Sequence, residues 1–189
     1  MADGRPLLTH REPAPSLRRR SRAGRVTSAL AALLCALVAA SVAGLLPLQL
    51  MRVDSDSMRP TLAAGDLVLV DHDTGPVRRM DVVAVRSPVT GGLLVKRVVG
   101  TAGDRVALED GWLVVDGQRV CEAGVDHSRL DGVFFGPVTV PAGELFLLGD
   151  ARGSSVDSRT FGTVPATDVV GAVLARVWPA PGPLHEHGC

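Results

Sequence analysis

The sequence contains almost no lysine. Of its 20 basic residues 19 are arginine, and Lys96 is the only lysine among 189 residues. Arginine stays protonated in proteins, whereas lysine can lose its proton when burial removes water from its amine. A position that keeps lysine in this background is a candidate for chemistry that needs a neutral amine. Lys96 lies in an apolar stretch, residues 93–99, whose neighbours are able to bury it.

Cysteine is also scarce, and the three cysteines do not form a disulfide framework. Cys35 lies in an apolar run, Cys121 in the middle of the chain and Cys189 at its end. A bridge between Cys121 and Cys189 is compatible with an oxidising compartment, but nothing in the spacing requires it. The five histidines are scattered, and no Cys/His spacing typical of a metal site is present. The sequence therefore predicts neither a metal site nor another cofactor.

The main part of the chain lacks an excess of positive charge. Residues 52–189 contain 13 basic and 18 acidic residues, which argues against the basic face of a nucleic-acid-binding protein. Residues 1–51 contain seven arginines against two acidic residues, a net charge of +5. The positive charge is thus concentrated at the N-terminus, beside an apolar run.

That run has no charged residue for 26 positions between Arg25 and Arg52. A helix needs about 20 residues to cross a membrane, whereas a cleaved signal peptide has an apolar core of about 7–15 residues. We therefore expect residues 26–51 to be a transmembrane anchor. The Arg-rich residues 1–25 are expected to be a disordered cytoplasmic tail, with the rest of the chain outside the plasma membrane.

Residues 52–179 are expected to form a mostly β domain with antiparallel sheets. Short apolar, β-branched runs alternate with Gly and Pro, and no amphipathic helix pattern is sustained. Asp116-Gly117 is typical of a type I′ hairpin turn. Residues 180–189 are expected to be a loose C-terminal tail. The expected strands are residues 66–70, 81–85, 93–99, 105–108, 112–115, 136–140, 145–148 and 169–177.

A serine-rich segment, Ser55 to Leu62, follows the expected anchor directly. A serine hydroxyl is a weak nucleophile unless a base accepts its proton. Taken alone, this segment is typical of a turn before Pro60, and a single remaining lysine is compatible with chance. Together, Ser57 and Lys96 suggest a nucleophile and its base. A third polar segment, residues 148–162, is either an ordinary surface loop or a support for that lysine, in which Asp157 and Arg159 would pair.

These segments together resemble bacterial type I signal peptidase, over nearly all of residues 53–179. Ser57 to Leu62 matches the Ser-Met-x-Pro-Thr-Leu box of that family. The further matches follow in the same order: Gly65-Asp66, Arg79 to Val83, Lys96 to Gly100 with Gly103-Asp104, Val140 to Gly143, and Phe146 to Gly162. The resemblance implies an antiparallel β catalytic domain behind one N-terminal transmembrane helix.

The resemblance also implies a Ser/Lys serine endopeptidase without a cofactor. Ser57 would be the nucleophile and Lys96 the general base, while the Ser57 N–H and the Ser55 hydroxyl would form the oxyanion hole. Ser155 would orient Lys96 by a hydrogen bond. An Asp157–Arg159 ion pair would brace the loop, which Asp150 and Arg152 would also shape.

The substrates implied by the resemblance are secretory preproteins, cut after small residues of an Ala-x-Ala type motif. Small apolar pockets would select these residues. The positions that match or flank the pocket residues of the family are Val53, Met58, Leu62, Leu94 and Val95. These side chains are equally compatible with an ordinary β core.

Two positions depart from the family pattern. Ala151 stands where the family usually has Asn, so one hydrogen bond of the loop would be missing. Met80 replaces a glycine, at a position where the backbone is expected to need conformational freedom. Neither residue is an expected participant in the chemistry.

Three other interpretations compete with this one. A self-cleaving repressor also uses Ser and Lys, but it carries a DNA-binding domain where this chain has an apolar run. An inactive membrane-anchored β module that binds signal peptides or partner proteins would have no need of the intact Ser57, Lys96 and Ser155. A Ser/His mechanism would use His72 or His127 as the base and would leave the lysine segment unexplained.

Overall fold

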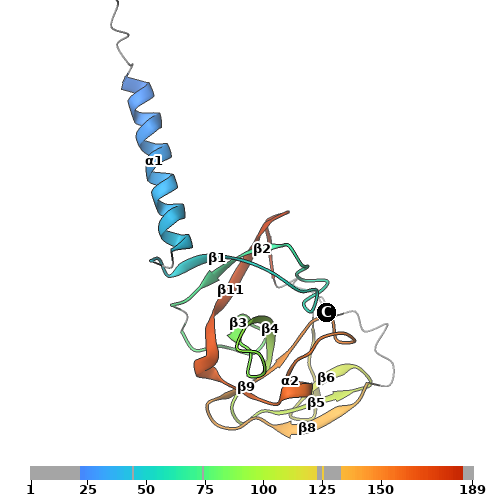
Figure 1. Ribbon diagram of the computed structural model, residues 1–189. Coiled ribbons are helices and arrows are strands. Elements are labelled where there is room, and N and C mark those ends of the chain that lie inside the picture. Colours follow the sequence, from blue (N-terminus) through green and yellow to red (C-terminus); the bar gives the residue numbers. More distant parts are fainter. Residues whose placement is uncertain (1–21, 44, 74, 123–124, 126–132, 185–189) are drawn as a thin grey trace, which may run out of the picture. The chain divides into compact units, whose positions relative to one another are not determined.

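The computed structural model describes residues 22–43, 45–73, 75–122, 125 and 133–184. One helix, α1 (Arg22–Val42), precedes a body of β-strands (Figure 1). Residues 22–38 belong to one compact unit and the chain from Ala39 onwards to another. The expected cytoplasmic tail lies almost entirely outside the described residues.

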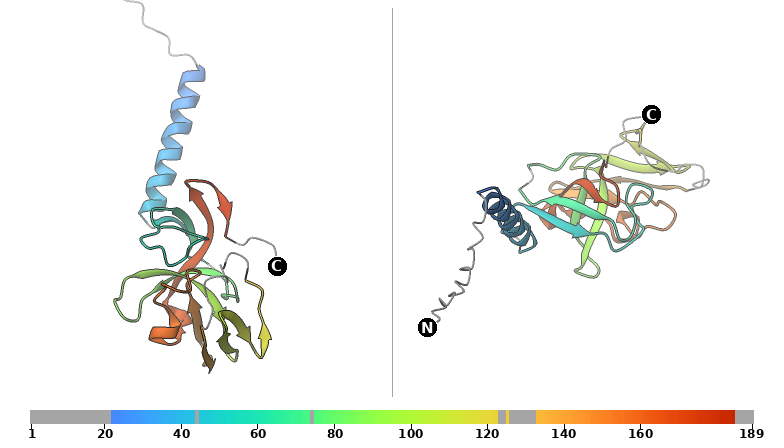
Figure 2. Two further views of the ribbon diagram at one scale, coloured as in Figure 1. Left: turned by 90° about the vertical axis from the view of Figure 1, so that its right-hand side faces the viewer. Right: turned by 90° about the horizontal axis from the view of Figure 1, so that it is seen from above.

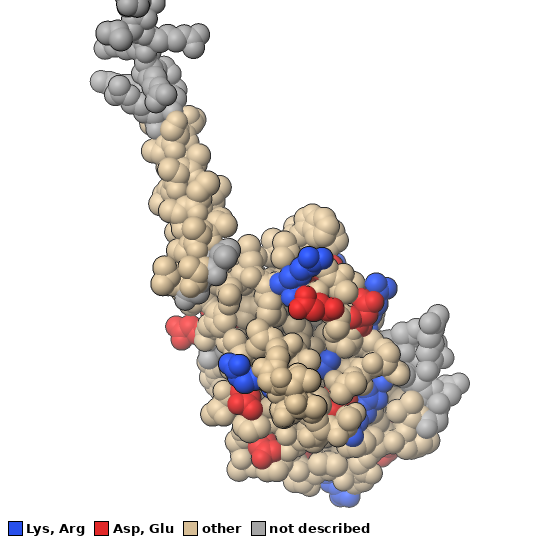
Figure 3. Space-filling view, in the orientation of Figure 1, with Lys and Arg blue, Asp and Glu red and all other residues tan. Residues whose placement is uncertain are grey.

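Helix α1 carries apolar side chains all around it. The side chains of residues 26–39 are all exposed. Residues 26–42 contain no charged residue, and Figure 3 shows the described part of the helix in tan, with neither blue nor red. Over the residues described, no helix is long and apolar enough to qualify as a membrane-crossing segment.

The uncharged stretch 26–51, expected as one anchor, is divided between two elements. The helix ends at Val42, and strand β1 (Leu48–Arg52) begins directly after Pro47. Proline lacks the N–H that a continuing helix would use. The side chains of β1 alternate between exposed and half-buried. This strand could not be recognised in the sequence, because its residues continue the apolar run that precedes them.

The body is mostly β and antiparallel, as expected. Its larger sheet has eight strands in the order β1-β2-β11-β3-β4-β9-β10, with β12 paired to β11, and its smaller sheet has the order β7-β6-β5-β8 (Figures 1 and 2). The described body has two short helical elements, α2 (Ser158–Phe161) and a 3-10 turn (Ala166–Asp168). The remaining strands are β2 (Leu67–Asp71), β3 (Val82–Arg86), β4 (Leu93–Gly100), β5 (Arg105–Glu109), β6 (Trp112–Val115), β7 (Gln118–Arg119), β8 (Phe135–Thr139), β9 (Glu144–Leu148), β10 (Val164–Pro165), β11 (Val169–Trp178) and β12 (Gly182–Pro183).

All eight expected strands are present, with ends that differ by one residue at most. The expected hairpin is also confirmed. Asp116 and Gly117 both have positive φ angles, 53° and 78°, as a type I′ turn requires. The turn places Val115 opposite Gln118 in the β6–β7 pair.

The cysteines differ in their state. Cys35 is a free thiol, whereas Cys121 is disulfide-bonded. Cys189, the partner considered above, lies outside the described residues.

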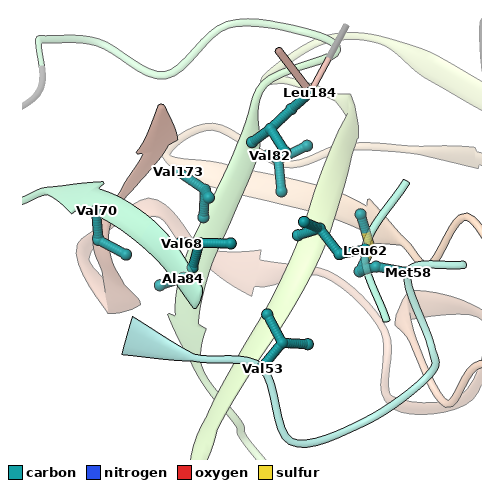
Figure 4. Packing of buried hydrophobic residues seen from close by; sticks show 9 residues of the cluster. All are labelled: Val53, Met58, Leu62, Val68, Val70, Val82, Ala84, Val173 and Leu184. Carbon is teal, nitrogen blue, oxygen red and sulfur yellow. The ribbon is translucent and has the colours of Figure 1, made fainter. Parts of the chain in front are cut away.

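Three apolar clusters stabilise the body. One includes Phe146 and Leu148 of β9 and Val106 of β5, and so joins the two sheets. A second packs between β3, β4 and β9. The third, drawn in Figure 4, brings side chains of β2, β3 and β11 against the segment that carries the serine motif. Its buried members are Val53, Met58, Leu62, Val68, Val70, Val82, Ala84, Val173 and Leu184.

The C-terminal segment is more ordered than the sequence predicts. Gly182–Pro183 forms β12 against β11, and the Leu184 side chain is 3% exposed in the cluster of Figure 4. The expected loose tail therefore does not begin at residue 180. The sequence around Leu184 consists mainly of Gly and Pro and has no apolar pattern from which the burial of this residue could be predicted.

We predict that Leu184→Ala lowers the free energy of unfolding by about 2–5 kcal/mol, because it leaves a cavity in this cluster. Denaturant unfolding of the detergent-solubilised protein measures the change. Leu174→Ala is the matched control, since Leu174 of β11 is 49% exposed, and should change stability by about 0.5 kcal/mol or less. Equal effects of the two substitutions would contradict the packing of Leu184.

Candidate active site

The serine motif lies in the loop between β1 and β2, and this loop is closed at its base. Val53 N donates to Asp66 O at 2.9 Å, and Gly65 N donates to Val53 O at 2.8 Å. The side chain of Asp56 accepts from Ala64 N at 2.9 Å. Directly after Ser57 the buried Met58 side chain enters the core. The core thus fixes the loop next to the hydroxyl of Ser57.

Lys96 lies on β4, and its amine reaches Ser57. Lys96 Nζ is 2.7 Å from Ser57 Oγ, although the side chain is only 2% exposed. Burial lowers the pKa of Lys96, against the opposing effect of the negative charges of Asp157 and Asp150. Among the described residues, no carboxylate lies within ion-pair distance of this amine. A neutral amine at this distance can accept the proton of the serine hydroxyl.

Ser55 lies beside the same hydroxyl. Its Oγ is 3.1 Å from Ser57 Oγ, and either oxygen can donate in this contact. The three atoms Ser55 Oγ, Ser57 Oγ and Lys96 Nζ therefore form a continuous polar chain. Sequence reasoning predicted that these three residues meet, and the structure brings them together.

The loop after β9 is held by the carboxylate of Asp157, which is fully buried. It accepts from Gly149 N at 3.0 Å and forms two bonds with the Arg159 guanidinium, from Nε at 2.8 Å and from Nη2 at 2.9 Å. It also caps α2 by accepting from Arg159 N. The expected Asp157–Arg159 ion pair is thus present, and it has the bidentate geometry that makes such pairs strong.

A second buried ion pair joins Asp150 to Arg97, the residue after Lys96. Asp150 accepts from Arg97 Nε at 2.8 Å and Nη2 at 2.6 Å, and from Thr61 Oγ1 at 2.5 Å. It therefore connects β4 and the loop after β9 with the serine segment. The sequence analysis did not predict this pair. Arg97, a second basic residue inside the apolar run 93–99, was the signal that a buried acidic partner was needed.

Met80 and Ala151, the two departures from the family pattern, both occupy structured positions. Met80 has a φ angle of 76°, a region that favours glycine, and its carbonyl accepts from Arg97 Nη1 at 3.0 Å. Ala151 N donates to the carbonyl of Ser57 at 3.1 Å. The loop thus contacts the nucleophile through its backbone, which the Asn-to-Ala difference leaves intact.

Ser155 does not make the expected hydrogen bond to Lys96. Its Oγ is buried without a hydrogen-bond partner among the described residues. It packs against Gly149, where an added Cβ would overlap both Ser155 Oγ and the carbonyl oxygen of Ser57. Ser155 therefore lies in the neighbourhood of the nucleophile, and Gly149 is a residue at the site that the sequence did not single out.

Arg152, expected to shape the same loop, is buried in an ion pair that the sequence did not predict. Its partner is Glu122, whose side chain is also completely buried. Arg152 Nη1 donates to Glu122 Oε2 at 2.9 Å, and Nη2 donates to Oε1. Arg152 Nε donates to the carbonyl of Gly149 at 3.1 Å.

The expected substrate-binding side chains fall into two groups. Val53, Met58 and Leu62 are buried in the cluster of Figure 4. Leu94 and Val95, on β4 just before Lys96, are only half-buried and pack on separate clusters. The first group therefore has the position of core residues, while the second keeps surface that another molecule can contact.

Neither histidine variant is supported by the described residues. The ring nitrogens of His72 are each 2.8 Å from an oxygen, those of Val170 and Gln49, and not from Ser57. His127 lies outside the described residues. No group of His, Cys, Asp and Glu suited to a metal ion occurs in the part of the chain that the structure covers.

Comparisons with known proteins agree with the motifs. Residues 26–178 match the family model described as signal peptidase, peptidase S26. A signal peptidase I of Bacillus caldolyticus is 39% identical over 142 residues, covering 67% of this chain and 78% of the relative. One of Leptolyngbya laminosa is 32% identical and covers 67% of each chain. The crystal structure of a signal peptidase I from Enterococcus faecalis V583 matches with a TM-score of 0.47 and 30% identity, over 53% of this chain and 98% of that one. The chain therefore belongs to the signal peptidase family, peptidase S26, and is an enzyme of the hydrolase class.

Proposed function

We propose that this protein is a membrane-bound serine endopeptidase that removes signal peptides from secretory preproteins. The observation that carries the proposal is the 2.7 Å contact between Ser57 Oγ and Lys96 Nζ. Burial lowers the pKa of this amine, so that it loses its proton, and can act as a base, more readily than a lysine exposed to water. The relatives named signal peptidase I support the choice of substrate.

The reaction begins when Ser57 Oγ attacks the scissile carbonyl carbon and Lys96 Nζ takes the hydroxyl proton. The negative oxygen of the tetrahedral intermediate accepts hydrogen bonds from the Ser57 N–H and the Ser55 hydroxyl. Lys96 then gives its proton to the leaving amine, and the peptide bond breaks to leave an acyl-enzyme on Ser57. A water molecule, deprotonated by Lys96, hydrolyses this ester and restores the serine.

The surrounding ion pairs keep Lys96 available for this role. Arg97 and Arg159, its cationic neighbours, are neutralised by bidentate contacts with Asp150 and Asp157. Because these carboxylates are paired with arginines, neither forms an ion pair with the amine. No direct ion pair among the described residues therefore offsets the burial of Lys96, and burial lowers its pKa although the charges of Asp157 and Asp150 oppose this effect.

The preference for small residues before the cut would arise from shallow apolar surface beside the dyad. Leu94 and Val95 are half-buried directly before Lys96, and Val53, Met58 and Leu62 lie in the core beneath the serine loop. An extended substrate that adds to a strand edge presents alternate side chains to such a surface. We propose that the accessible parts of Leu94 and Val95 limit the substrate to small residues of the Ala-x-Ala type, while the buried Val53, Met58 and Leu62 support this surface from the core.

The proposed location is the plasma membrane, with a single anchor within residues 26–51. The absence of charge between Arg25 and Arg52 and the exposed apolar side chains of α1 support this. Clustered arginines before an apolar span stay in the cytoplasm, which places the catalytic body on the outer side, where secreted preproteins emerge.

We predict that Ser57→Ala and Lys96→Arg each reduce cleavage of a preprotein by about 10⁴-fold or more, without change in the fold. The first removes the nucleophile, and the second replaces the base by a group that stays protonated. Cleavage by purified protein in detergent measures the rates, and circular dichroism checks the fold. Arg86→Lys exchanges the same two side chains at an exposed position and should keep full activity.

Substantial cleavage by either folded variant would refute the Ser/Lys mechanism. If wild-type protein cuts no member of a panel of signal sequences, while still binding them, the inactive binding module becomes the better description.

The pH dependence should follow the protonation of Lys96. Only the neutral amine accepts a proton, so kcat/KM should rise with pH through the pKa of Lys96 and level off above it. Because burial lowers this pKa, the midpoint should lie below 10.5, the ordinary value for lysine. Initial rates across a pH series measure the midpoint; a rise centred at or above 10.5 would contradict a desolvated base.

The orientation in the membrane is tested by proteolysis of intact spheroplasts. We expect added protease to remove the body and to leave an N-terminal epitope tag intact, because the arginine cluster stays in the cytoplasm. The tag should be digested once the membrane is permeabilised. Digestion of the tag in intact spheroplasts, with the body protected, would reverse the proposed topology.

A further inference from the structure

The Arg152–Glu122 ion pair is not used by the mechanism above, although it is as deeply buried as the pairs that are. The two side chains are 1% and 0% exposed. Removing one partner from a buried pair leaves an uncompensated charge and is far more costly than losing a surface pair. Both charges must therefore stay together for the guanidinium to remain inside.

The guanidinium of Arg152 holds a backbone group of the active site. Its Nε donates to the carbonyl of Gly149 at 3.1 Å, while the N–H of Gly149 donates to Asp157 Oδ2 at 3.0 Å. Gly149 is thus fixed by a hydrogen bond from its N–H and another to its C=O. Because a Cβ at Gly149 would overlap the Ser57 carbonyl and Ser155 Oγ, a shift of this residue toward that side would press on the nucleophile segment.

Glu122 belongs to a different part of the body from the loop that it supports. It follows β7, and Val120 just before it donates from its N–H to Leu113 O of β6 at 2.8 Å. The side chain of Val120 packs on the cluster that joins the two sheets. The carboxylate is therefore held by the smaller sheet, whereas Arg152 and Gly149 follow β9 of the larger sheet.

We propose that Glu122 is a positioning residue for the Ser57–Lys96 pair, acting through Arg152 and Gly149. This inference rests on the proposed peptidase activity. The smaller sheet thereby contributes to catalysis: its carboxylate keeps the Arg152 guanidinium buried, the guanidinium fixes the Gly149 carbonyl, and Gly149 sets the place of Ser57 against Lys96. No atom of Glu122 has to touch the substrate.

The test is Glu122→Gln in the full chain, with kcat and KM measured on a preprotein in detergent. Glutamine keeps the shape but leaves the Arg152 charge without a counterion. We expect kcat to fall by about 10- to 100-fold, as for other small displacements of reacting groups, while KM stays unchanged. The midpoint of the pH dependence of kcat/KM should also remain unchanged, since the charges that act on the pKa of Lys96 are those of Asp157, Asp150 and Arg159.

Glu144→Gln is the matched control. Glu144 lies on β9 and accepts a hydrogen bond from the Thr163 hydroxyl. The substitution Glu144→Gln should leave kcat unchanged. Arg152→Lys provides a second variant, because lysine keeps the charge but cannot bond Glu122 and Gly149 at once. If the two residues act along one path, the double variant should be no slower than the slower single variant.

The outcomes separate the inference from the function on which it rests. Unchanged kcat in folded Glu122→Gln, or a raised KM at unchanged kcat, would overturn the positioning role. Should Glu122→Gln fail to fold, an unchanged kcat in folded Arg152→Lys would overturn it equally. Failure of wild-type protein to cleave at all would instead refute the proposed function.

Discussion

The active site depends on one amine that is buried without an ion-pair partner among the described residues. Lys96 is 2% exposed and directly follows half-buried residues of β4, yet its amine contacts a serine hydroxyl instead of a carboxylate. Burying an unpaired ammonium is very costly, so the group loses its proton more readily than it would in water. The next residue, Arg97, is buried on the same strand and cannot lose its proton, and it is paired with Asp150. Arg97 thus has an ion-pair partner while the adjacent Lys96 has a lowered pKa, and this difference would allow Lys96 to act as the proposed base.

The other features of the site keep this arrangement in place. Asp150 connects the strand of Lys96 with the loop after β9 and, through Thr61, with the serine segment. Asp157 fixes the same loop from the other side by bonding Gly149 and Arg159. Met58 and Leu62 anchor the serine segment in the core. The hydroxyl and the amine are therefore positioned by elements that are far apart in the sequence, and the contacts that stabilise the body are the same ones that would serve the proposed catalysis.

Much of this could be predicted from the sequence, because each signal was local. The strands were evident from short β-branched runs between Gly and Pro, and Asp116-Gly117 fixed the type of one turn. The lone lysine and the serine motif indicated the dyad. Strand β1 could not be separated from the apolar run before it, and Leu184 had no pattern around it. The Asp150–Arg97 and Glu122–Arg152 pairs were missed because partners 53 and 30 residues apart leave no trace in spacing. Ser155 shows the limit of a resemblance: its side chain is buried beside Gly149, but the expected hydrogen bond to Lys96 is not formed.

The lowered pKa of the buried Lys96 amine can be measured without any assay of activity. Because the chain has a single lysine, incorporation of lysine labelled only with ¹⁵N at Nζ or only with ¹³C at Cε yields one NMR signal that needs no assignment. The titration should be followed in detergent. We expect a midpoint below 10.5, the ordinary pKa of lysine, and a return toward that value on unfolding. A midpoint at or above 10.5 in the folded protein would mean that the amine is charged, and Lys96 could not then be the base.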